Sequence, residues 1–210
     1  MTTTESPVNR ANIYRFLSHI FRRELSGSVA ASLASSGVLE LLEEDGFAVG
    51  STDFANEARL KELSADYTRV FLGPGPHVSP YGSVHHPDDL KRGRLWGDTT
   101  VWVKRFIADH GVGLEGEKYD GIPDHVGHLL EFFSLLIEGE AKASEEGDAE
   151  KVARLTNSQR LLVEKQLGRW IPEFCRKVQS RASSGFYRGV AHLTAELVAV
   201  EQVRLGRANG

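Results

Sequence analysis

The sequence predicts an all-α protein, a compact bundle of about eight to ten helices. Two observations lead to this prediction. Apolar residues recur at intervals of three and four along most of the 210 residues, which is the period of an amphipathic helix. No segment of useful length alternates apolar and polar residues, as a half-buried strand would. A chain of this length suffices for one domain, residues 1–210, or for two small lobes, with a hydrophobic core.

The composition excludes several classes of function. Apolar residues make up 40% of the chain and charged residues 26%, as in globular proteins in water. A net charge of −4, without any block rich in lysine and arginine, argues against nucleic-acid binding. No run of about 18 apolar residues is present, so we expect no membrane insertion. The single cysteine, Cys175, excludes an intrachain disulfide and fits a reducing compartment.

The N-terminal residues lack a basic region followed by an apolar core, so no cleaved signal peptide is expected. Arg22-Arg23 superficially resembles the arginine pair of an export signal. However, Glu24 follows directly, and Glu40 and Glu43 interrupt the apolar part. We therefore interpret the pair as the end of an amphipathic helix.

Three helices are expected in the first 73 residues. Pro7 fits the first helical position of the first one. The second is expected to span Leu25 to Glu44. Asp53 fits the N-cap of the third helix, and Gly73 followed by Pro74 is typical of its C-terminal end.

The stretch from Gly73 to Pro87 carries four prolines and three glycines in fifteen positions. Such a composition excludes regular secondary structure. A long, stiff loop inside a compact domain is more often functional than filler. The sequence Pro87-Asp88-Asp89 is expected to restart a helix, with acidic residues in its first turn. Asp98 is expected to cap the next helix, which ends at His110-Gly111.

The stretch from Asp120 to Glu140 predicts a buried central helix. Pro123 fits its first position, and Asp124 and His125 follow at once. Apolar residues then occupy nearly every face from Leu129 to Ile137, which indicates a helix inside a core. A carboxylate and an imidazole are therefore expected at the entrance to a hydrophobic interior.

The segments before and after the central helix predict a hinge and the boundaries of the remaining helices. Residues 111–122 are rich in glycine and polar side chains, and we interpret them as a hinge between two helical lobes. The central helix is expected to fray through Ala141 to Gly147, and Asp148 to cap the next helix. Pro172 must bend or restart the helix that contains it. Gly185 is expected to end that region before the last helix.

Three segments carry a resemblance to a known family. They are YTRVFLGPGPHVSPYGSV (Tyr67 to Val84), LWGDTTVWVKRFIADHG (Leu95 to Gly111), and Pro123-Asp124-His125 followed by Glu131-Phe132. In order and spacing they resemble the TorD/DmsD family of redox-enzyme maturation chaperones, which is broadly related to the NarJ-type chaperones. The C-terminal segments WIPEF and GFYRGVAHLTAEL fit as well. Ser79 and His85-His86 depart from the family's pattern, which often has a second proline and an aromatic residue there.

The resemblance implies an all-helical, cytoplasmic and non-enzymatic chaperone without a cofactor. Such chaperones bind the twin-arginine signal peptide, or the apo form, of a molybdenum-cofactor oxidoreductase until cofactor insertion and export. The family includes monomers and homodimers, some of them domain-swapped, and the hinge at residues 111–122 is where exchange would be easiest. The sequence does not name the client oxidoreductase.

The residues can supply a peptide-binding site. A signal peptide is an arginine pair followed by an apolar helix-former, so its receptor needs acceptors at one end of an apolar groove. Asp124 can accept a charge-assisted hydrogen bond from an arginine, and His125 can orient Asp124 or contact the peptide backbone. We expect the Pro-rich loop, from Gly73 to Val84, and the start of the central helix at Asp124 to form one site. Its candidate residues are Phe71, Gly73, Pro74, Pro80, Tyr81, Ser83, Trp96, Asp124 and His125.

Simpler interpretations apply to some of the same residues. Asp124, in the first turn of a helix, would also serve as a partner of the helix dipole. His125 would equally be a hydrogen-bonded structural histidine. We interpret the large apolar side chains of the central and following helices as core: Phe132, Phe133, Trp170 and Phe174.

A metal-binding helical bundle, or a metalloenzyme, is the main alternative. Asp124, His128 and Glu131 are spaced i, i+4 and i+7, which places them on one helix face, and His85 and His86 could approach from the loop. Against this alternative, no Glu-x-x-His partner occurs elsewhere in the sequence. Nucleotide binding is also unsupported, because the sequence lacks the G-x-x-x-x-G-K-[ST] motif. The single cysteine has no activating neighbour in the sequence, so nucleophilic catalysis is unsupported.

Overall fold

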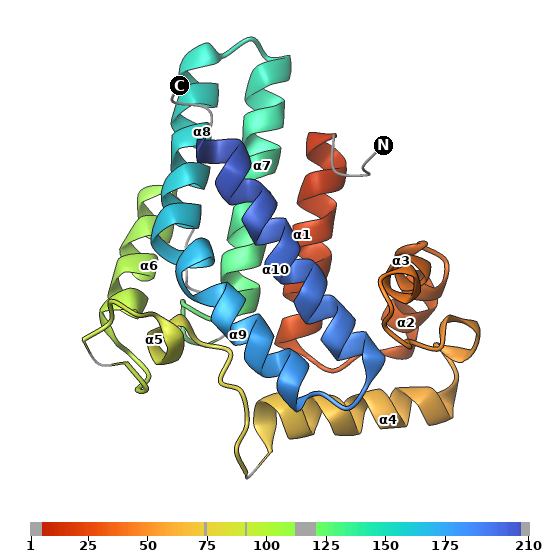
Figure 1. The fold of residues 1–210 in the computed structure, drawn as a ribbon. Helices are drawn as coiled ribbons and strands as arrows, with labels where there is room; N and C mark the ends of the chain where they lie inside the picture. The colour runs from red at the N-terminus through yellow and green to blue at the C-terminus, as the bar shows by residue number, and fades with distance from the viewer. Residues whose placement is uncertain (1–5, 74, 91, 112–120, 207–210) are drawn as a thin grey trace. The chain divides into compact units, whose positions relative to one another are not determined.

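The computed structural model describes residues 6–73, 75–90, 92–111 and 121–206. Within these ranges the protein is all-α, as predicted, and its one β-type contact is an isolated bridge between Tyr81 and His125 (Figure 1). No helix in this part of the chain is long and apolar enough to cross a bilayer. The helices are α1 (Pro7–Arg22), α2 (Gly27–Ala34), α3 (Val38–Glu44), α4 (Glu57–Tyr67), α5 (Gly82–His85), α6 (Asp98–Asp109), α7 (Val126–Glu145), α8 (Ala149–Leu162), α9 (Gly168–Arg181) and α10 (Gly185–Gly206).

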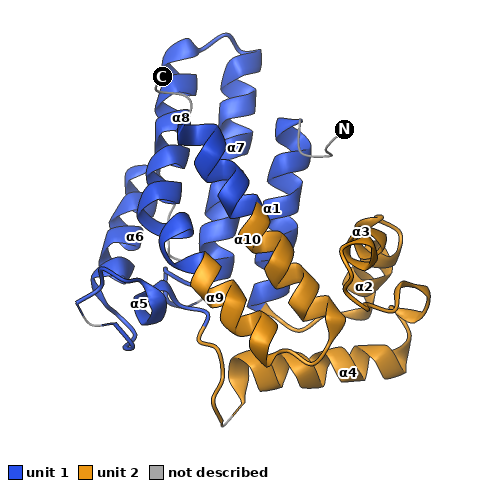
Figure 2. Ribbon diagram, viewed as in Figure 1, with its two compact units in different colours: residues 1–22, 80–171, 197–210 blue, residues 23–79, 172–196 orange. Residues whose placement is uncertain are grey.

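The chain forms two compact units (Figure 2). Unit 1 comprises Met1–Arg22, Pro80–Ile171 and Leu197–Gly210, and unit 2 comprises Arg23–Ser79 and Pro172–Glu196. Of the hinge predicted at residues 111–122, residues 112–120 lie outside the described residues. The hinge therefore stays a prediction.

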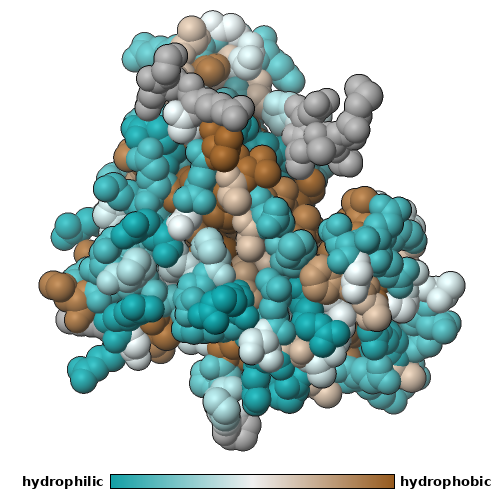
Figure 3. Space-filling model, in the orientation of Figure 1, coloured by the Kyte–Doolittle hydropathy of each residue, from teal (hydrophilic) through white to brown (hydrophobic). Residues whose placement is uncertain are grey.

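The core of unit 1 forms where α7 packs against α1 and α8. The apolar run from Leu129 to Ile137 is buried as predicted, except that Leu135 is 40% exposed. Gly127 allows the close approach of α1, because a Cβ atom there would lie 2.3 Å from Arg22 Cγ and 2.9 Å from the Ser18 carbonyl oxygen. In the space-filling view, hydrophobic residues show as a band over unit 1 on a face that is otherwise mostly hydrophilic (Figure 3).

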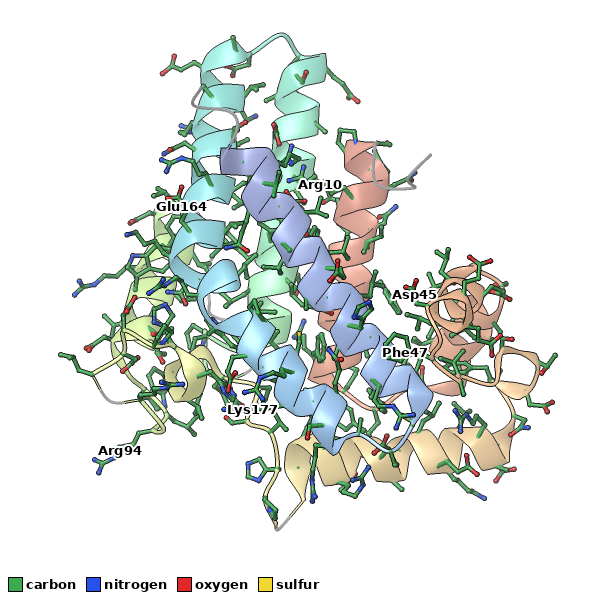
Figure 4. All side chains as sticks on the ribbon, in the orientation of Figure 1. Arg10, Asp45, Phe47, Arg94, Glu164 and Lys177 are labelled. Carbon is green, nitrogen blue, oxygen red and sulfur yellow. The ribbon has the colours of Figure 1, made fainter. Side chains whose placement is uncertain are left out.

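A buried polar network also joins the helices of unit 1. Arg10 of α1 points in among the helices (Figure 4). Its Nε donates to Glu201 of α10 at 2.5 Å, and one terminal nitrogen donates to Gln159 of α8 at 2.5 Å. Gln159 in turn donates to Glu140 of α7 at 2.6 Å. Four helices are thus held by charges that are partnered inside the protein, as buried charges must be.

The Asp66 carboxylate is a buried polar contact in unit 2. Asp66 of α4 accepts the backbone N–H groups of Ser183 and Ser184, at 3.1 and 2.8 Å, and is paired with Arg69. These N–H groups immediately precede α10, so Asp66 stabilises the start of that helix. Burial raises the pKa of Asp66, but the hydrogen bonds from Ser184, Ser183 and Arg69 outweigh it and hold the pKa below its usual value.

Several predicted boundaries in the first half of the chain are wrong. The expected helix from Leu25 to Glu44 is split into α2 and α3, because Gly37 adopts a left-handed φ of 75° between them. Asp53 ends a short 3₁₀ turn, and Asn56 is the residue that caps α4, through a 2.7 Å bond from the Arg59 N–H. The predicted end at Gly73 is confirmed, after a π turn at Thr68–Leu72.

The prediction that Gly73 to Pro87 lacks regular secondary structure is wrong at Gly82–His85, which form the short helix α5. The helix predicted at Pro87-Asp88-Asp89 is also wrong, because Pro87 and Asp88 form a turn and Asp89 belongs to no helix. The Asp89 carboxylate instead accepts the N–H of Thr99 at 2.9 Å, so it caps α6 from ten residues away. Gly97 is the N-cap residue of α6, and Asp98 is its first helical residue. The predicted end at His110 is confirmed.

The central helix differs from the prediction at both ends. Pro123 lies in a turn, and α7 begins at Val126 with His125 as its N-cap residue. The predicted fraying from Ala141 is wrong, since α7 continues to Glu145. Asp148 caps α8 as predicted, by accepting the Lys151 N–H at 2.9 Å.

The helix containing Pro172 neither stops nor restarts at that residue. Pro172 lies inside α9. The irregular turn is a π turn at Val163–Leu167, directly before α9. A π turn inserts an extra residue into a helix, so the departure from regular geometry predicted here occurs one turn before the proline.

Candidate functional site

The end of the Pro-rich loop lies against the start of α7 in unit 1. The Gly82 N–H donates to the Asp124 carbonyl at 2.9 Å, and the Val126 N–H donates to the Pro80 carbonyl at 2.8 Å. Between these two bonds, Tyr81 and His125 form an antiparallel bridge. We call residues Pro80–Ser83 and Asp124–Val126 the loop–helix junction.

Asp124 holds this junction together from inside. Its side chain is fully buried, and Oδ2 accepts the backbone N–H of Ser83 at 2.6 Å. Ser83 lies in the first turn of α5, where backbone N–H groups lack helical acceptors. Burial raises the pKa of Asp124, and the hydrogen bond from the Ser83 N–H offsets only part of this rise. Asp124 therefore serves the first turn of α5, and the prediction that it lies in the first turn of its own helix is wrong.

His125 caps α7 with its ring. Nδ1 accepts the Gly127 N–H at 3.0 Å, which requires an unprotonated nitrogen. Burial, followed by the electrostatic influence of His128 and Arg22, lowers the pKa of His125 to about 3. The ring meets Tyr81 edge-on, with centroids 5.2 Å apart. His125 is thus a neutral, hydrogen-bonded histidine that is partly exposed beside Tyr81.

Trp170 forms the floor under the junction. It is fully buried, as predicted, and its ring stacks on His85 with centroids 5.9 Å apart and an interplanar angle of 7°. A Cβ atom at Gly82 would lie 3.0 Å from Trp170 Nε1 and 3.1 Å from Thr99 Cγ2. Only glycine therefore fits at this position without a shift of its neighbours. Sequence reasoning assigned Trp170 to the core but gave no signal that it supports the loop.

The remaining candidate residues do not all lie at this junction. Trp96 lies in unit 1, in the loop before α6, where it is 56% exposed with a left-handed φ of 62°. Phe71 and Gly73 belong to unit 2. Phe71 is buried beside the rings of Tyr67, Phe174 and Tyr187, so it is a core residue. Gly73 ends the π turn of unit 2. Pro74 lies outside the described residues.

The metal-site alternative is not supported by these positions. Asp124 holds the loop, and Glu131 forms an ion pair with Arg22 at 2.7 Å. His86 Nε2 bonds to the Lys165 carbonyl at 2.8 Å. Across the described ranges, no three His, Cys, Asp or Glu side chains are grouped to hold a metal ion. Burial raises the pKa of the Cys175 thiol far above its usual range, as expected of an unreactive structural cysteine.

Over the described residues, the fold and the junction define a class: an all-α protein in which a proline-rich loop is held to the start of a buried helix. Comparison with known proteins assigns the family. The family model described as "Nitrate reductase delta subunit" matches residues 39–176. The chain belongs to this family, because the match covers more than half of it.

Curated relatives agree with this assignment. "Chaperone protein TorD" of Shigella boydii is 27% identical over 210 residues, covering 93% of this chain and 96% of the relative. The proteins of the same name from Shewanella loihica and Photobacterium profundum are 25% and 27% identical. They cover 96% and 88% of this chain, and 96% and 88% of their own lengths. These relatives confirm the prediction of a TorD-type molybdoenzyme maturation chaperone that is not an enzyme.

Proposed function

We propose that this chaperone binds the twin-arginine signal peptide of an apo-molybdoenzyme and holds it until the cofactor has been inserted. The proposal places the protein in the cytoplasm, since a leader must be bound before export. The single observation that carries it is the loop–helix junction. Most of this junction is buried and held by hydrogen bonds, and two partly exposed rings, Tyr81 and His125, meet edge-on at its surface.

Preorganisation is what makes the junction suited to peptide binding. Two backbone hydrogen bonds and the Asp124–Ser83 bond hold the loop to α7. Binding a peptide to a loop that is already ordered avoids much of the entropic cost of association. Tyr81 offers an aromatic face and a hydroxyl, and burial together with the Asp124 charge raises its pKa, so the phenol stays protonated. His125, being neutral, does not repel an arginine.

Asp124 has an indirect part in this proposal. Because its carboxylate is buried and bonded to Ser83, it acts as a positioning residue for the loop rather than as an exposed acceptor for arginine. The acceptor role first considered for Asp124 stays a prediction. Separating the two roles requires a variant that keeps the bond to Ser83 but loses the charge.

The experiment that tests the function is copurification from cells of the natural host. A tagged full-length chain is expected to capture a molybdoenzyme that still carries its twin-arginine leader, identified by mass spectrometry. The captured amount should fall when the leader is deleted from that molybdoenzyme. Recovery of unrelated proteins only, or equal capture of the leaderless enzyme, would contradict the proposal. Sedimentation velocity on the free and loaded chain would report monomer or homodimer.

A further inference from the structure

An ion pair between α1 and α7 lies beside the loop–helix junction. Arg22, the first member of the Arg22-Arg23 pair in the sequence, is the last residue of α1. Its nitrogen Nη1 donates to Glu131 Oε2 of α7 at 2.7 Å. The side chains of Arg22 and Glu131 are 18% and 27% exposed, and both residues belong to unit 1. The pair is therefore open to solvent on one side.

Arg22 reaches Glu131 across the first turn of α7. A Cβ atom at Gly127 would lie 2.3 Å from Arg22 Cγ, and Glu131 follows Gly127 by four residues, on the same face of the helix. The Gly127 N–H is the group that the His125 ring accepts. Arg22 also contributes to the lowered pKa of His125, so its charge acts at the junction. Through its ring, His125 connects this ion pair to Tyr81.

Glu131 is a carboxylate near the junction that an arginine can reach from solvent. The Asp124 carboxylate is fully buried and accepts the Ser83 N–H. Glu131 keeps part of its side chain exposed, and the bond from Arg22 engages one of its two oxygens. Arginine binds a carboxylate most strongly through two parallel hydrogen bonds. A guanidinium that meets both oxygens therefore has an advantage over Arg22 at this carboxylate.

The charges around the pair favour exchange of one arginine for another. The ionisable residues one turn away are His128 on α7 and His19 on α1, and neither type carries a fixed charge at neutral pH. One carboxylate neutralises one guanidinium, so a second arginine binds Glu131 in place of Arg22 rather than beside it. The long Arg22 side chain has many rotamers, which lets its guanidinium move into solvent while α1 stays in place.

We propose that Glu131 receives an arginine of the client's leader and that the chain's own Arg22 occupies this carboxylate until a leader binds. This inference rests on the proposed function and names a solvent-accessible acceptor beside the junction. The leader's arginine then lies close to His125, and the residues that follow it meet the partly exposed rings of His125 and Tyr81. A lysine gains less from the exchange, because its single ammonium cannot bond both oxygens in parallel.

A second ion pair between the same two helices provides the control. Arg15 of α1 is paired with Glu138 of α7, and their side chains are 46% and 40% exposed. Glu138 follows Glu131 by seven residues, so it lies about two turns further from the junction along α7. Arg15→Gln changes the net charge of the chain as Arg22→Gln does, which controls for a general electrostatic effect on a cationic peptide.

The test measures the affinity of the full chain for a fluorescent synthetic peptide, an arginine pair followed by about twelve leucines and alanines. Glu131→Gln should weaken binding about tenfold or more, because a charge-assisted hydrogen bond is lost. Arg22→Gln should strengthen binding about fivefold, because an internal occupant reduces the fraction of molecules whose site is open. Arg15→Gln and Glu138→Gln should each change affinity less than about twofold, because their pair lies away from the site.

Thermal melting separates this role from a structural one. Arg22→Gln and Glu131→Gln remove the same ion pair, so they should lower the melting temperature by similar amounts. Their effects on affinity should nevertheless have opposite signs, which a shared folding defect cannot produce.

The failures of the two proposals are distinguishable. If the wild type does not bind the peptide, both are overturned. If the wild type binds and Glu131→Gln binds equally well, Glu131 is not the acceptor, and the inference is overturned while the proposed function stands. If Arg22→Gln leaves the affinity unchanged or weakens it, Arg22 does not compete with the leader, which overturns the inference as well.

Discussion

The Asp124 carboxylate accepts the backbone N–H of Ser83 at 2.6 Å, across 41 residues of sequence. This bond joins the Pro-rich loop to the start of the buried central helix. It also places Tyr81 beside His125, the pair that forms the exposed part of the junction. The recognition surface proposed here depends on this bond, so the first prediction concerns it.

Replacing Asp124 by asparagine keeps an oxygen that can accept the Ser83 N–H but removes the charge. The pKa of Asp124 is raised in the folded state. A carboxyl group with a raised folded pKa contributes stability that is present below its unfolded pKa of about 3.9 and is lost as the pH rises through the folded value. Asp124→Asn should therefore gain melting temperature relative to the wild type as the pH rises above about 4.

The same variant separates the two roles of Asp124 in binding. If Asp124 only positions the loop, Asp124→Asn should bind a leader peptide nearly as well as the wild type, whereas Asp124→Ala should bind more weakly because the Ser83 N–H loses its partner. Calorimetry measures both affinities, with Asp45→Asn as the control for an exposed carboxylate. Equal losses in the asparagine and alanine variants would show that the charge itself binds the ligand.

His125 should make the protein less stable in acid. Its pKa is lowered to about 3 in the folded state, so below its unfolded pKa of about 6.5 the unfolded chain takes up a proton that the folded chain does not. At pH 5 this costs up to about 2 kcal/mol. His125→Asn retains a side-chain acceptor for the cap of α7 and should lose less stability between pH 7.5 and pH 5. Identical pH dependence of urea unfolding in the two proteins would contradict this account.

Gly82→Ala should destabilise the protein by overpacking the junction against Trp170. The new Cβ atom would lie 3.0 Å from Trp170 Nε1 and 3.1 Å from Thr99 Cγ2. Overpacking of this kind costs about 1–3 kcal/mol. Gly75→Ala is the matched control, because a Cβ atom there meets nothing within 4 Å. Chemical denaturation of the two variants measures the difference, and equal stabilities would refute the close packing of the loop on Trp170.

Arg10→Met should destabilise unit 1 strongly. It removes a 2.5 Å partner of the buried Glu201 and leaves Arg204, at 2.9 Å, as the remaining ion-pair partner, so the loss should approach the cost of about 3–5 kcal/mol for breaking a buried ion pair. The double variant Arg10→Met with Glu201→Met should recover much of this loss, because the buried Glu201 charge is then removed together with Arg10. Arg15→Met, which removes the exposed pair with Glu138, should cost less than about 1 kcal/mol. A loss in the double variant as large as in the single one would contradict the argument.

The helical fold was predictable because its signals are local. Apolar stripes at helical spacing, the cap at Asp148 and the stop at Gly73 depend on neighbours within a few residues. The buried positions of Phe132, Phe133 and Trp170 follow from the same stripes.

The boundaries that were missed depend on contacts distant in sequence. Pro123 precedes two residues that looked like a helical first turn, but Pro123 and Asp124 form a turn, and His125, bridged to Tyr81, keeps an extended backbone, so the helix begins only at Val126. Asp89 resembled an acid in its own helix, whereas its carboxylate caps α6 at Thr99. Sequence patterns do not show which backbone N–H, distant in sequence, will donate a hydrogen bond to a given carboxylate.

The candidate site was predicted only in part for the same reason. Pro80, Tyr81, Ser83, Asp124 and His125 do come together. Phe71 is packed among rings in the core of unit 2, a position that its aromatic character alone could not reveal.

The central claim is that this chain recognises a twin-arginine leader, and isothermal titration of the full chain with two matched peptides tests it most directly. One peptide carries the arginine pair before its apolar segment, and the other carries two lysines in the same positions. We predict saturable binding of the arginine peptide and at least tenfold weaker binding of the lysine peptide, because arginine alone offers a planar fork of donors. Absence of binding, or equal affinity for both peptides, would contradict the account.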